Sequence, residues 1–264
     1  MQRLLTCLLG ISIIFCSLNL QGQDFSEFAK ARSISPKGDT LNYRILWPAN
    51  YDKNQKYPLV LFLHGGGERG NDNEKQLTHG AKLFLDADFR ADHPCIVMIP
   101  QCPTDSYWAA ATIDRSVQPF DIQVDYSKGV PRPLEHSVQL VQQFIKEGRV
   151  DKKQVYITGL SMGGMGTYQA VATYPKLFAA AATICGVGDP AKYTKKAAKV
   201  PFRIFHGDAD QVVTVEGSRN MYRRLQDLGA KVVTYTEYPG VNHNSWDNAF
   251  KEPDFLDWFF QYKK

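Results

Sequence analysis

The sequence predicts an α/β protein with a mostly parallel central sheet and helices on both faces. Two observations support this fold class. Short, strand-like apolar runs alternate along the chain with segments of helical periodicity. The apolar runs are nearly continuous, which is typical of strands that are buried on both faces of a parallel sheet.

The N-terminal residues 1–22 have the pattern of a secretory signal peptide. Arg3 supplies a positive charge, residues 4–20 form a mostly apolar run, and Gly22 lies near a plausible cleavage point. A single membrane anchor is the alternative, but polar residues such as Asn19 weaken it. We therefore expect an exported protein, periplasmic or secreted, with no stable membrane insertion after the signal is removed.

The remaining residues, 23–264, have a length that suits a single α/β catalytic domain. The chain has 31 Lys and Arg residues against 27 Asp and Glu residues, and no basic run is interleaved with aromatic residues. Nucleic acid is therefore not an expected partner. The sequence also lacks a C-x-x-C pair and an H-E-x-x-H motif, so we expect no metal or other cofactor.

The elements follow from these patterns in chain order. The predicted strands cover residues 43–47, 59–63, 96–99, 155–157, 180–184, 202–205 and 232–238. The predicted helices cover residues 74–86, 134–147, 162–173, 216–228 and 254–262. Residues 103–133 show neither pattern, and an irregular segment of that length is usually functional or mobile.

Residues 155–166, VYITGLSMGGMG, contain the motif G-x-S-x-G at Gly159, Ser161 and Gly163. The motif lies between a predicted strand and a predicted helix, which is the context that a nucleophilic serine requires. The two glycines leave room for strand and helix to approach each other while the serine stands on a tight turn. A glycine-rich turn used only for packing or for binding phosphate is the alternative. We interpret Ser161 as a nucleophile.

Polar residues follow the other predicted strands at their carboxyl ends, where ligands bind in such sheets. Asp210 follows the strand at 202–205, and His243 follows the last strand, so the chain order is serine, aspartate, histidine. An imidazole accepts the proton of an attacking serine, and a carboxylate holds that imidazole in the correct tautomer. Asp208 is a weaker candidate for the acid, because an aspartate directly on a turn more often binds its own backbone.

The negative charge that develops on an ester oxygen requires preorganised N–H donors. We expect the backbone N–H of Met162, directly after the nucleophile, to be one donor. The second is expected from the glycine loop at 65–67, where the absence of side chains lets the backbone approach a substrate. Gly66 is the favoured donor, with Gly67 as the alternative.

These motifs resemble the α/β-hydrolase superfamily. The segment HGGGERG with Asn71-Asp72-Asn73, the segment PQCP at 100–103 with Trp108, and His243-Asn244-Ser245-Trp246 are similar to secreted esterases that are often labelled predicted peptidases. That group is similar in turn to feruloyl esterases, acetylxylan esterases and polyhydroxyalkanoate depolymerases. The resemblance runs from about Tyr43 to the C-terminus and implies the α/β-hydrolase fold with a serine esterase activity.

Three residues are candidate substrate contacts: Gln101, Trp108 and Trp246. Gln101 follows a strand end, and the tryptophans are candidate platforms for a sugar or phenolic ring, although buried tryptophans also simply pack the core. Arg69 is suited to bind a carboxylate with two hydrogen bonds, and an internal ion pair with Glu68 or Asp72 is the alternative.

The sequence as a whole predicts an exported serine carboxylic-ester hydrolase that acts through an acyl-enzyme. Small-molecule esters, or acetyl and feruloyl esters linked to polysaccharides, are the expected substrates. A serine peptidase of the prolyl-oligopeptidase type is the first alternative, because it shares the same triad chemistry. A non-catalytic, hydrolase-like binding module is the second alternative, and the presence of all three triad residues disfavours it.

Overall fold

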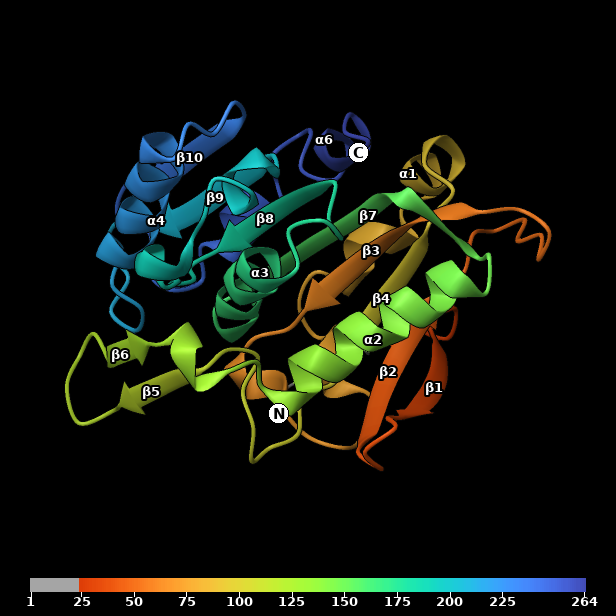
Figure 1. Ribbon diagram of the computed structural model, residues 1–264, viewed down its shortest axis with the longest axis horizontal. Coiled ribbons are helices and arrows are strands. Elements are labelled where there is room, and N and C mark those ends of the chain that lie inside the picture. The colour runs from red at the N-terminus through yellow and green to blue at the C-terminus, as the bar shows by residue number, and fades with distance from the viewer. Residues whose placement is uncertain (1–23) are drawn as a thin grey trace, which may run out of the picture.

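The computed structural model describes residues 24–264, and eight strands of this part of the chain form one sheet (Figure 1). The spatial order is β1-β2-β4-β3-β7-β8-β9-β10. Pairs β1–β2 and β2–β4 are antiparallel, and every other neighbouring pair is parallel. The strands are β1 (Ala29–Ile34), β2 (Thr40–Leu46), β3 (Tyr57–Leu63), β4 (Ile96–Pro100), β7 (Val150–Leu160), β8 (Ala180–Ile184), β9 (Phe202–Gly207) and β10 (Val233–Tyr238).

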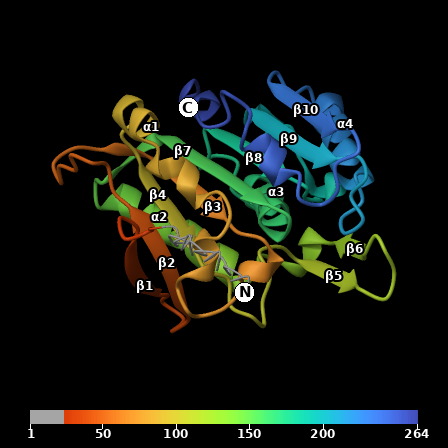
Figure 2. The same cartoon turned by 180° about the vertical axis from the view of Figure 1, so that it is seen from behind.

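Helices cover both faces of this sheet, as the view from behind also shows (Figure 2). One face packs against α2 (Arg132–Lys146), α3 (Met162–Thr173) and α4 (Glu216–Asp227). The other packs against α1 (Ala87–Asp92), α5 (Trp246–Ala249) and α6 (Asp257–Phe260). None of the helices in the described part of the chain combines the length and the hydropathy needed to cross a bilayer.

Strand β3 shows why the predicted apolar runs are continuous. Leu59, Leu61 and Leu63 belong to the core on the α2–α4 face, whereas Val60 and Phe62 belong to the core on the opposite face. Successive side chains of a strand point to opposite faces, so a strand covered on both sides buries all of them. The predicted fold class, a mostly parallel sheet with helices on both faces, is confirmed.

Several elements differ from the prediction. The helix predicted at 254–262 is limited to the short helix α6 (Asp257–Phe260). The predicted helix at 74–86 is wrong, because this segment forms two 3-10 turns, Lys75–Leu77 and Ala81–Leu85. Gly80 between them has φ 80°, which no continuous α-helix contains. The edge strand β1 was not predicted, because its sequence AKARSI is half polar and mostly exposed, so it contains no apolar run.

The irregular segment predicted at 103–133 contains a two-stranded hairpin, β5 (Ala111–Asp114) and β6 (Asp121–Val124). It stands apart from the main sheet, below α3 and α4 in Figure 1. The backbone N–H of Phe120 donates to Val212 O at 3.0 Å, and the N–H of Ala110 donates to Gln169 Oε1 at 2.7 Å. These contacts anchor the hairpin next to the carboxyl ends of the parallel strands.

The predicted signal peptide at 1–22 lies outside the described residues.

Candidate active site

Ser161 stands on the turn between β7 and α3, with φ 53° and ψ −118°. A non-glycine residue seldom adopts this conformation, and its neighbours must hold it there. A Cβ atom on Gly163 would lie 1.9 Å from the carbonyl oxygen of Leu63, and one on Gly159 would lie 2.5 Å from that of Gly163. The glycines of the motif therefore permit the close strand–helix contact that exposes the serine hydroxyl.

The turn places Ser161 within hydrogen-bond reach of the residue predicted as its base. His243 Nε2 lies 2.9 Å from Ser161 Oγ, and His243 Nδ1 lies 2.8 Å from Asp210 Oδ2. These side chains come from three loops, after β7, β9 and β10, at the carboxyl edge of the sheet. The structure thus brings together three residues separated by up to 82 positions. The arrangement has the geometry of a nucleophile, a base and an orienting acid.

Asp210 is buried, and both of its oxygens are fully used. Its Oδ1 accepts hydrogen bonds from the backbone N–H groups of Val212 and Val213, at 2.8 and 2.9 Å. Burial alone would raise the pKa of Asp210, but hydrogen bonds from His206 and His243 hold the pKa well below its usual range. The carboxylate therefore stays ionised and can stabilise a protonated His243.

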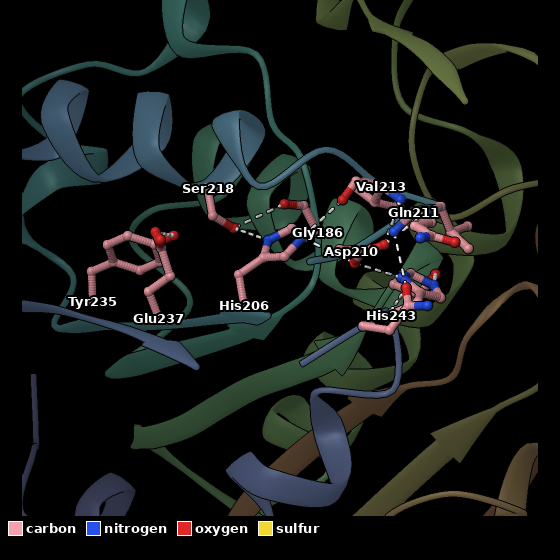
Figure 3. Close-up of polar contacts among 12 residues, drawn as sticks. Gly186, His206, Asp210, Gln211, Val213, Ser218, Tyr235, Glu237 and His243 are labelled. Carbon is pink, nitrogen blue, oxygen red and sulfur yellow. Dashed lines mark hydrogen bonds and ion pairs between the residues drawn. The ribbon is translucent and has the colours of Figure 1, made fainter. Parts of the chain in front are cut away.

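His206 is a further partner of this carboxylate (Figure 3). Its Nε2 lies 3.1 Å from Asp210 Oδ2, and its Nδ1 lies 2.7 Å from Ser218 Oγ, which in turn contacts Gly186 O at 3.1 Å. Figure 3 shows His206 and His243 on opposite sides of Asp210. The sequence signal for this contact is the i, i+4 spacing of His206 and Asp210.

Asp208, the alternative acid, is exposed and accepts a hydrogen bond from the backbone N–H of Gly240 at 2.6 Å. It braces the turn after β9 and does not contact His243 among the described contacts. This is the local bonding that an aspartate on a turn favours.

Two backbone N–H groups beside Ser161 begin helical turns. Met162 is the first residue of α3, and Gly66 is the first residue of the 3-10 turn Gly66–Glu68. The first N–H groups of a helical turn have no acceptor inside it, so they are free to donate to a bound oxyanion. Met162 and Gly66 both line the same cavity as Ser161.

This cavity has a volume of about 490 Å³, and both Ser161 and His243 line it. The hairpin β5–β6 supplies one wall, with Ile113, Arg115, Phe120 and Ile122. Sequence reasoning missed this wall, because the hairpin lay in the segment without a recognisable pattern. The other lining residues are Gly65, Gly66, Gly67, Glu68, Arg69, His79, Tyr107, Leu160, Ser161, Met162, Met165, Val212, Val213, His243 and Trp246.

Of the three expected substrate contacts, only Trp246 lines the cavity, with its ring centroid 5.4 Å from that of His243. Gln101 is 1% exposed; its Oε1 accepts from the N–H of Asn73, and its Nε2 donates to Asp72 Oδ1 at 2.8 Å. Trp108 is fully buried. The expectation that Gln101 and Trp108 contact substrate is therefore not retained, because protein atoms surround them.

Trp108 and His64 instead hold the glycine loop in place. Trp108 Nε1 donates to the carbonyl of His64 at 3.1 Å, and the N–H of Cys102 donates to His64 Nε2 at 2.9 Å. Burial lowers the pKa of His64 to about 4, so the ring is neutral and its Nδ1–H donates to Gly65 O. The glycine loop that contains Gly66 is thus connected, through His64, to Cys102 in the segment after β4.

Among residues 24–264, one group of three side chains has the spacing of metal ligands: Cys185, Asp210 and His243. Asp210 and His243 are already hydrogen-bonded to each other. Burial raises the pKa of the Cys185 thiol far above its usual value, which disfavours the thiolate that binds metals.

Comparisons with known proteins agree with this fold. The sequence profile of the phospholipase/carboxylesterase family matches residues 50–255. The chain is 37% identical over 197 residues to the bifunctional acetylxylan esterase/xylanase of Neocallimastix patriciarum, covering 73% of this chain and 25% of that protein. It is 25% identical over 264 residues to an uncharacterized secreted protein of Arthroderma benhamiae, covering 85% and 26%. The chain thus spans about a quarter of the length of these two curated relatives.

The chain is also similar to solved structures of esterases. A thermostable esterase has a TM-score of 0.79 and 36% sequence identity, over 90% of this chain and 64% of that chain. Ferulic acid esterases have TM-scores of 0.61 and 0.65 at 15% and 17% identity, which shows a common fold alone.

An α/β-hydrolase sheet that carries a hydrogen-bonded serine, histidine and aspartate at its carboxyl edge defines the class of serine hydrolases. The chain belongs to the phospholipase/carboxylesterase family, whose profile matches most of its length. Its enzyme class is accordingly that of the carboxylesterases.

Proposed function

We propose that this protein is an exported esterase that hydrolyses acetyl or feruloyl esters of polysaccharides through an acyl-enzyme on Ser161. One observation carries the catalytic part: the unbroken hydrogen-bond chain from Asp210 through His243 to Ser161, which ends in the cavity of about 490 Å³. Residues 23–264 act in this proposal as one catalytic domain.

The first half of the reaction follows from the positions of these atoms. Ser161 Oγ attacks the ester carbonyl carbon, and its proton passes to His243 Nε2 at 2.9 Å. The negative charge moves to the carbonyl oxygen, which the N–H groups of Met162 and Gly66 stabilise. Asp210 stabilises the imidazolium through Nδ1. When the bond to the alcohol oxygen breaks, His243 returns the proton to that oxygen and the alcohol leaves.

The second half repeats these roles with water. His243 accepts a proton from a water molecule as the water oxygen attacks the acyl carbon on Ser161. The bond between the acyl carbon and Ser161 Oγ then breaks, the proton returns to Oγ, and the carboxylic acid departs. The enzyme's side chains end in the state in which they began.

The substrate proposal is supported by the cavity and by the relatives. Trp246 is partly exposed, lines the cavity beside His243, and is suited to contact a sugar or phenolic ring. A relative with 37% identity is named for acetylxylan, and solved ferulic acid esterases share the fold. Export is supported by the pattern of residues 1–22 and by a distant relative that is a secreted protein.

The test is steady-state hydrolysis by the purified protein from residue 23 onward, on p-nitrophenyl acetate and butyrate, methyl ferulate, acetylated xylan and a prolyl-peptide anilide. We expect turnover of esters, with the highest kcat/KM on acetylated xylan or methyl ferulate. The variant Ser161→Ala should lose kcat by on the order of 10⁴-fold or more. Ser127→Ala, which alters an exposed serine outside the cavity, is the matched control and should keep wild-type kcat.

Other outcomes would redirect the proposal. Turnover of the anilide without turnover of esters would favour the peptidase alternative. A folded wild-type protein that hydrolyses none of the panel would favour a hydrolase-like binding module.

A further inference from the structure

Two arginines meet at one tyrosine on the wall of the active-site cavity. The guanidinium carbon of Arg69 lies 4.7 Å from the ring centroid of Tyr107, and Arg115 Nη2 lies 3.4 Å from the Tyr107 hydroxyl. All three residues line the cavity that contains Ser161. We call this group of Arg69, Tyr107 and Arg115 the arginine rim.

Neither arginine of the rim forms an ion pair with a carboxylate within residues 24–264. Arg69 donates from Nε to Gly66 O and from Nη1 to the carbonyls of Thr104 and Ser106, which leaves its Nη2 without a protein acceptor there. The alternative that Arg69 pairs with Glu68 or Asp72 is wrong. Glu68 lies beside His79, and the side chain of Asp72 binds Lys75 and Gln101.

The hairpin β5–β6 places Arg115 on the wall of the cavity. Along β5, Ile113 is partly buried and lines the cavity, whereas Asp114 is exposed. Arg115 is an exposed residue directly after the end of β5. Its guanidinium carbon lies 5.0 Å from the ring centroid of Phe120, and both residues line the cavity. On β6, Asp121 is exposed and Ile122 lines the cavity. Arg115 of the hairpin thus lines the cavity, whereas the exposed Asp114 and Asp121 do not.

The rim brings two guanidinium groups, Arg69 and Arg115, to a cavity lining whose one acidic residue in the described part of the chain is Glu68. The hydrogen bond from Arg115 and the charges of Arg69 and Arg115 lower the pKa of Tyr107, although partial burial opposes the change. Glu68 is the acidic residue of the lining, but its Oε1 lies 3.9 Å from His79 Nε2 and its Oε2 is buried. The cavity lining thus contains two guanidinium groups, those of Arg69 and Arg115, and one carboxylate, that of Glu68, which lies beside His79.

We propose that the arginine rim binds a carboxylate carried by the ester substrate, so that the enzyme prefers anionic esters to neutral ones. The proposal rests on the esterase function proposed above and names the substrate class more closely. Guanidinium groups bind carboxylates through charge-assisted hydrogen bonds, and Arg69 Nη2 and the free nitrogens of Arg115 supply the donors. The carboxylate is either on the alcohol, as in a uronic acid sugar, or on the acyl group, as in a dicarboxylic half-ester.

The experiment compares esters that differ only in charge. The alcohol-side pair is p-acetoxybenzoate and p-acetoxybenzamide, and the acyl-side pair is mono-p-nitrophenyl adipate and its terminal amide. For each pair we measure the ratio of kcat/KM for the anionic ester to kcat/KM for the neutral one. We expect a ratio about tenfold higher in wild type than in Arg115→Gln or Arg69→Gln for at least one pair, as for one charge-assisted hydrogen bond. That pair identifies where the carboxylate lies.

Arg132→Gln is the matched control, because Arg132 is exposed, pairs with Asp39 and lies outside the cavity. It should keep the wild-type ratio for both pairs. Added NaCl should lower the wild-type ratio toward that of Arg115→Gln, since salt screens exposed charges. The inference is overturned if neutral esters are hydrolysed but both ratios are the same in wild type and in the two rim variants.

A binding measurement separates this inference from the esterase proposal. Trp246 lines the cavity, so its fluorescence can report titration with p-hydroxybenzoate and adipate, each against its amide. Tighter binding of a carboxylate than of its amide in wild type, lost in Arg115→Gln, supports the rim even if no ester is hydrolysed. Equal binding of acid and amide in wild type and variant, for both compounds, contradicts it.

Discussion

At the scale of single residues, Asp210 is the point where two histidines meet. One carboxylate oxygen contacts both His206 and His243, and the other is held by two backbone N–H groups. The backbone contacts orient the carboxylate, and the histidines keep it ionised. The position of His243 therefore depends on Asp210, which His206 and the backbone N–H groups of Val212 and Val213 hold in place.

We expect Asp210→Asn to lower kcat on p-nitrophenyl acetate by on the order of 10⁴-fold while the protein stays folded. The amide oxygen can still accept from Val212 and Val213, but the amide carries no charge to stabilise a protonated His243. Steady-state kinetics measure the loss, and circular dichroism checks the fold. Asp208→Asn, the exposed neighbour, is the control and should keep wild-type kcat. An Asp210→Asn enzyme with wild-type kcat would rule out this residue as the orienting acid.

At the scale of elements, the unit β7, turn and α3 depends on contact between backbones. The site of a Cβ on Gly163 is occupied by the carbonyl of Leu63 on β3, so neither partner is a flexible side chain that can move aside. The nucleophile's exposure is thus a consequence of how closely α3 packs on the sheet.

Gly163→Ala should destabilise the protein by about 3 kcal/mol or more, because the added methyl group forces α3 away from β3. Gly67→Ala is the control: a Cβ there meets nothing within 4 Å, and we expect less than about 1 kcal/mol. Urea unfolding gives both values, and loss of soluble folded protein for Gly163→Ala alone would agree with them. Equal unfolding midpoints for the two variants would contradict the steric account.

At the scale of the whole molecule, an ion pair between Arg219 and Glu237 joins α4 to β10. Glu237 accepts from Arg219 Nε and Nη2 at 2.9 and 2.5 Å. It also accepts from the hydroxyl of Tyr235 (Figure 3). The hydrogen bonds from Arg219 lower the pKa of Glu237 from 4.5 to about 2. A carboxyl with a lowered pKa in the folded state stabilises that state above its unfolded pKa, and the contribution disappears as pH falls toward the folded pKa.

We therefore expect the difference in unfolding free energy between wild type and Glu237→Gln to be constant above pH 4.5 and to shrink as pH falls toward about 2. Urea titrations at several pH values in this window measure it. Asp227→Asn, which changes an exposed acid with no ion pair in the described part of the chain, should show no such trend. A difference for Glu237→Gln that does not change with pH would show that the ion pair contributes nothing through this carboxylate.

The sequence alone was sufficient for the fold class and for the three residues of the hydrogen-bond chain. Apolar runs report burial on both faces of a sheet, and G-x-S-x-G reports a turn that only glycines permit, so both signals are local. The prediction of a helix at 74–86 was wrong because Gly80 has φ 80°. The sequence does not reveal the φ angle of a glycine in a helical pattern.

The tertiary structure decided which polar and aromatic residues reach the substrate cavity. Gln101 and Trp108 have the chemistry of binding residues, yet partners from distant segments bury them. Arg115 has no motif around it, yet the hairpin turns it toward Tyr107. The exposure of a side chain depends on which distant segments pack against it, and no local pattern in the sequence contains that information.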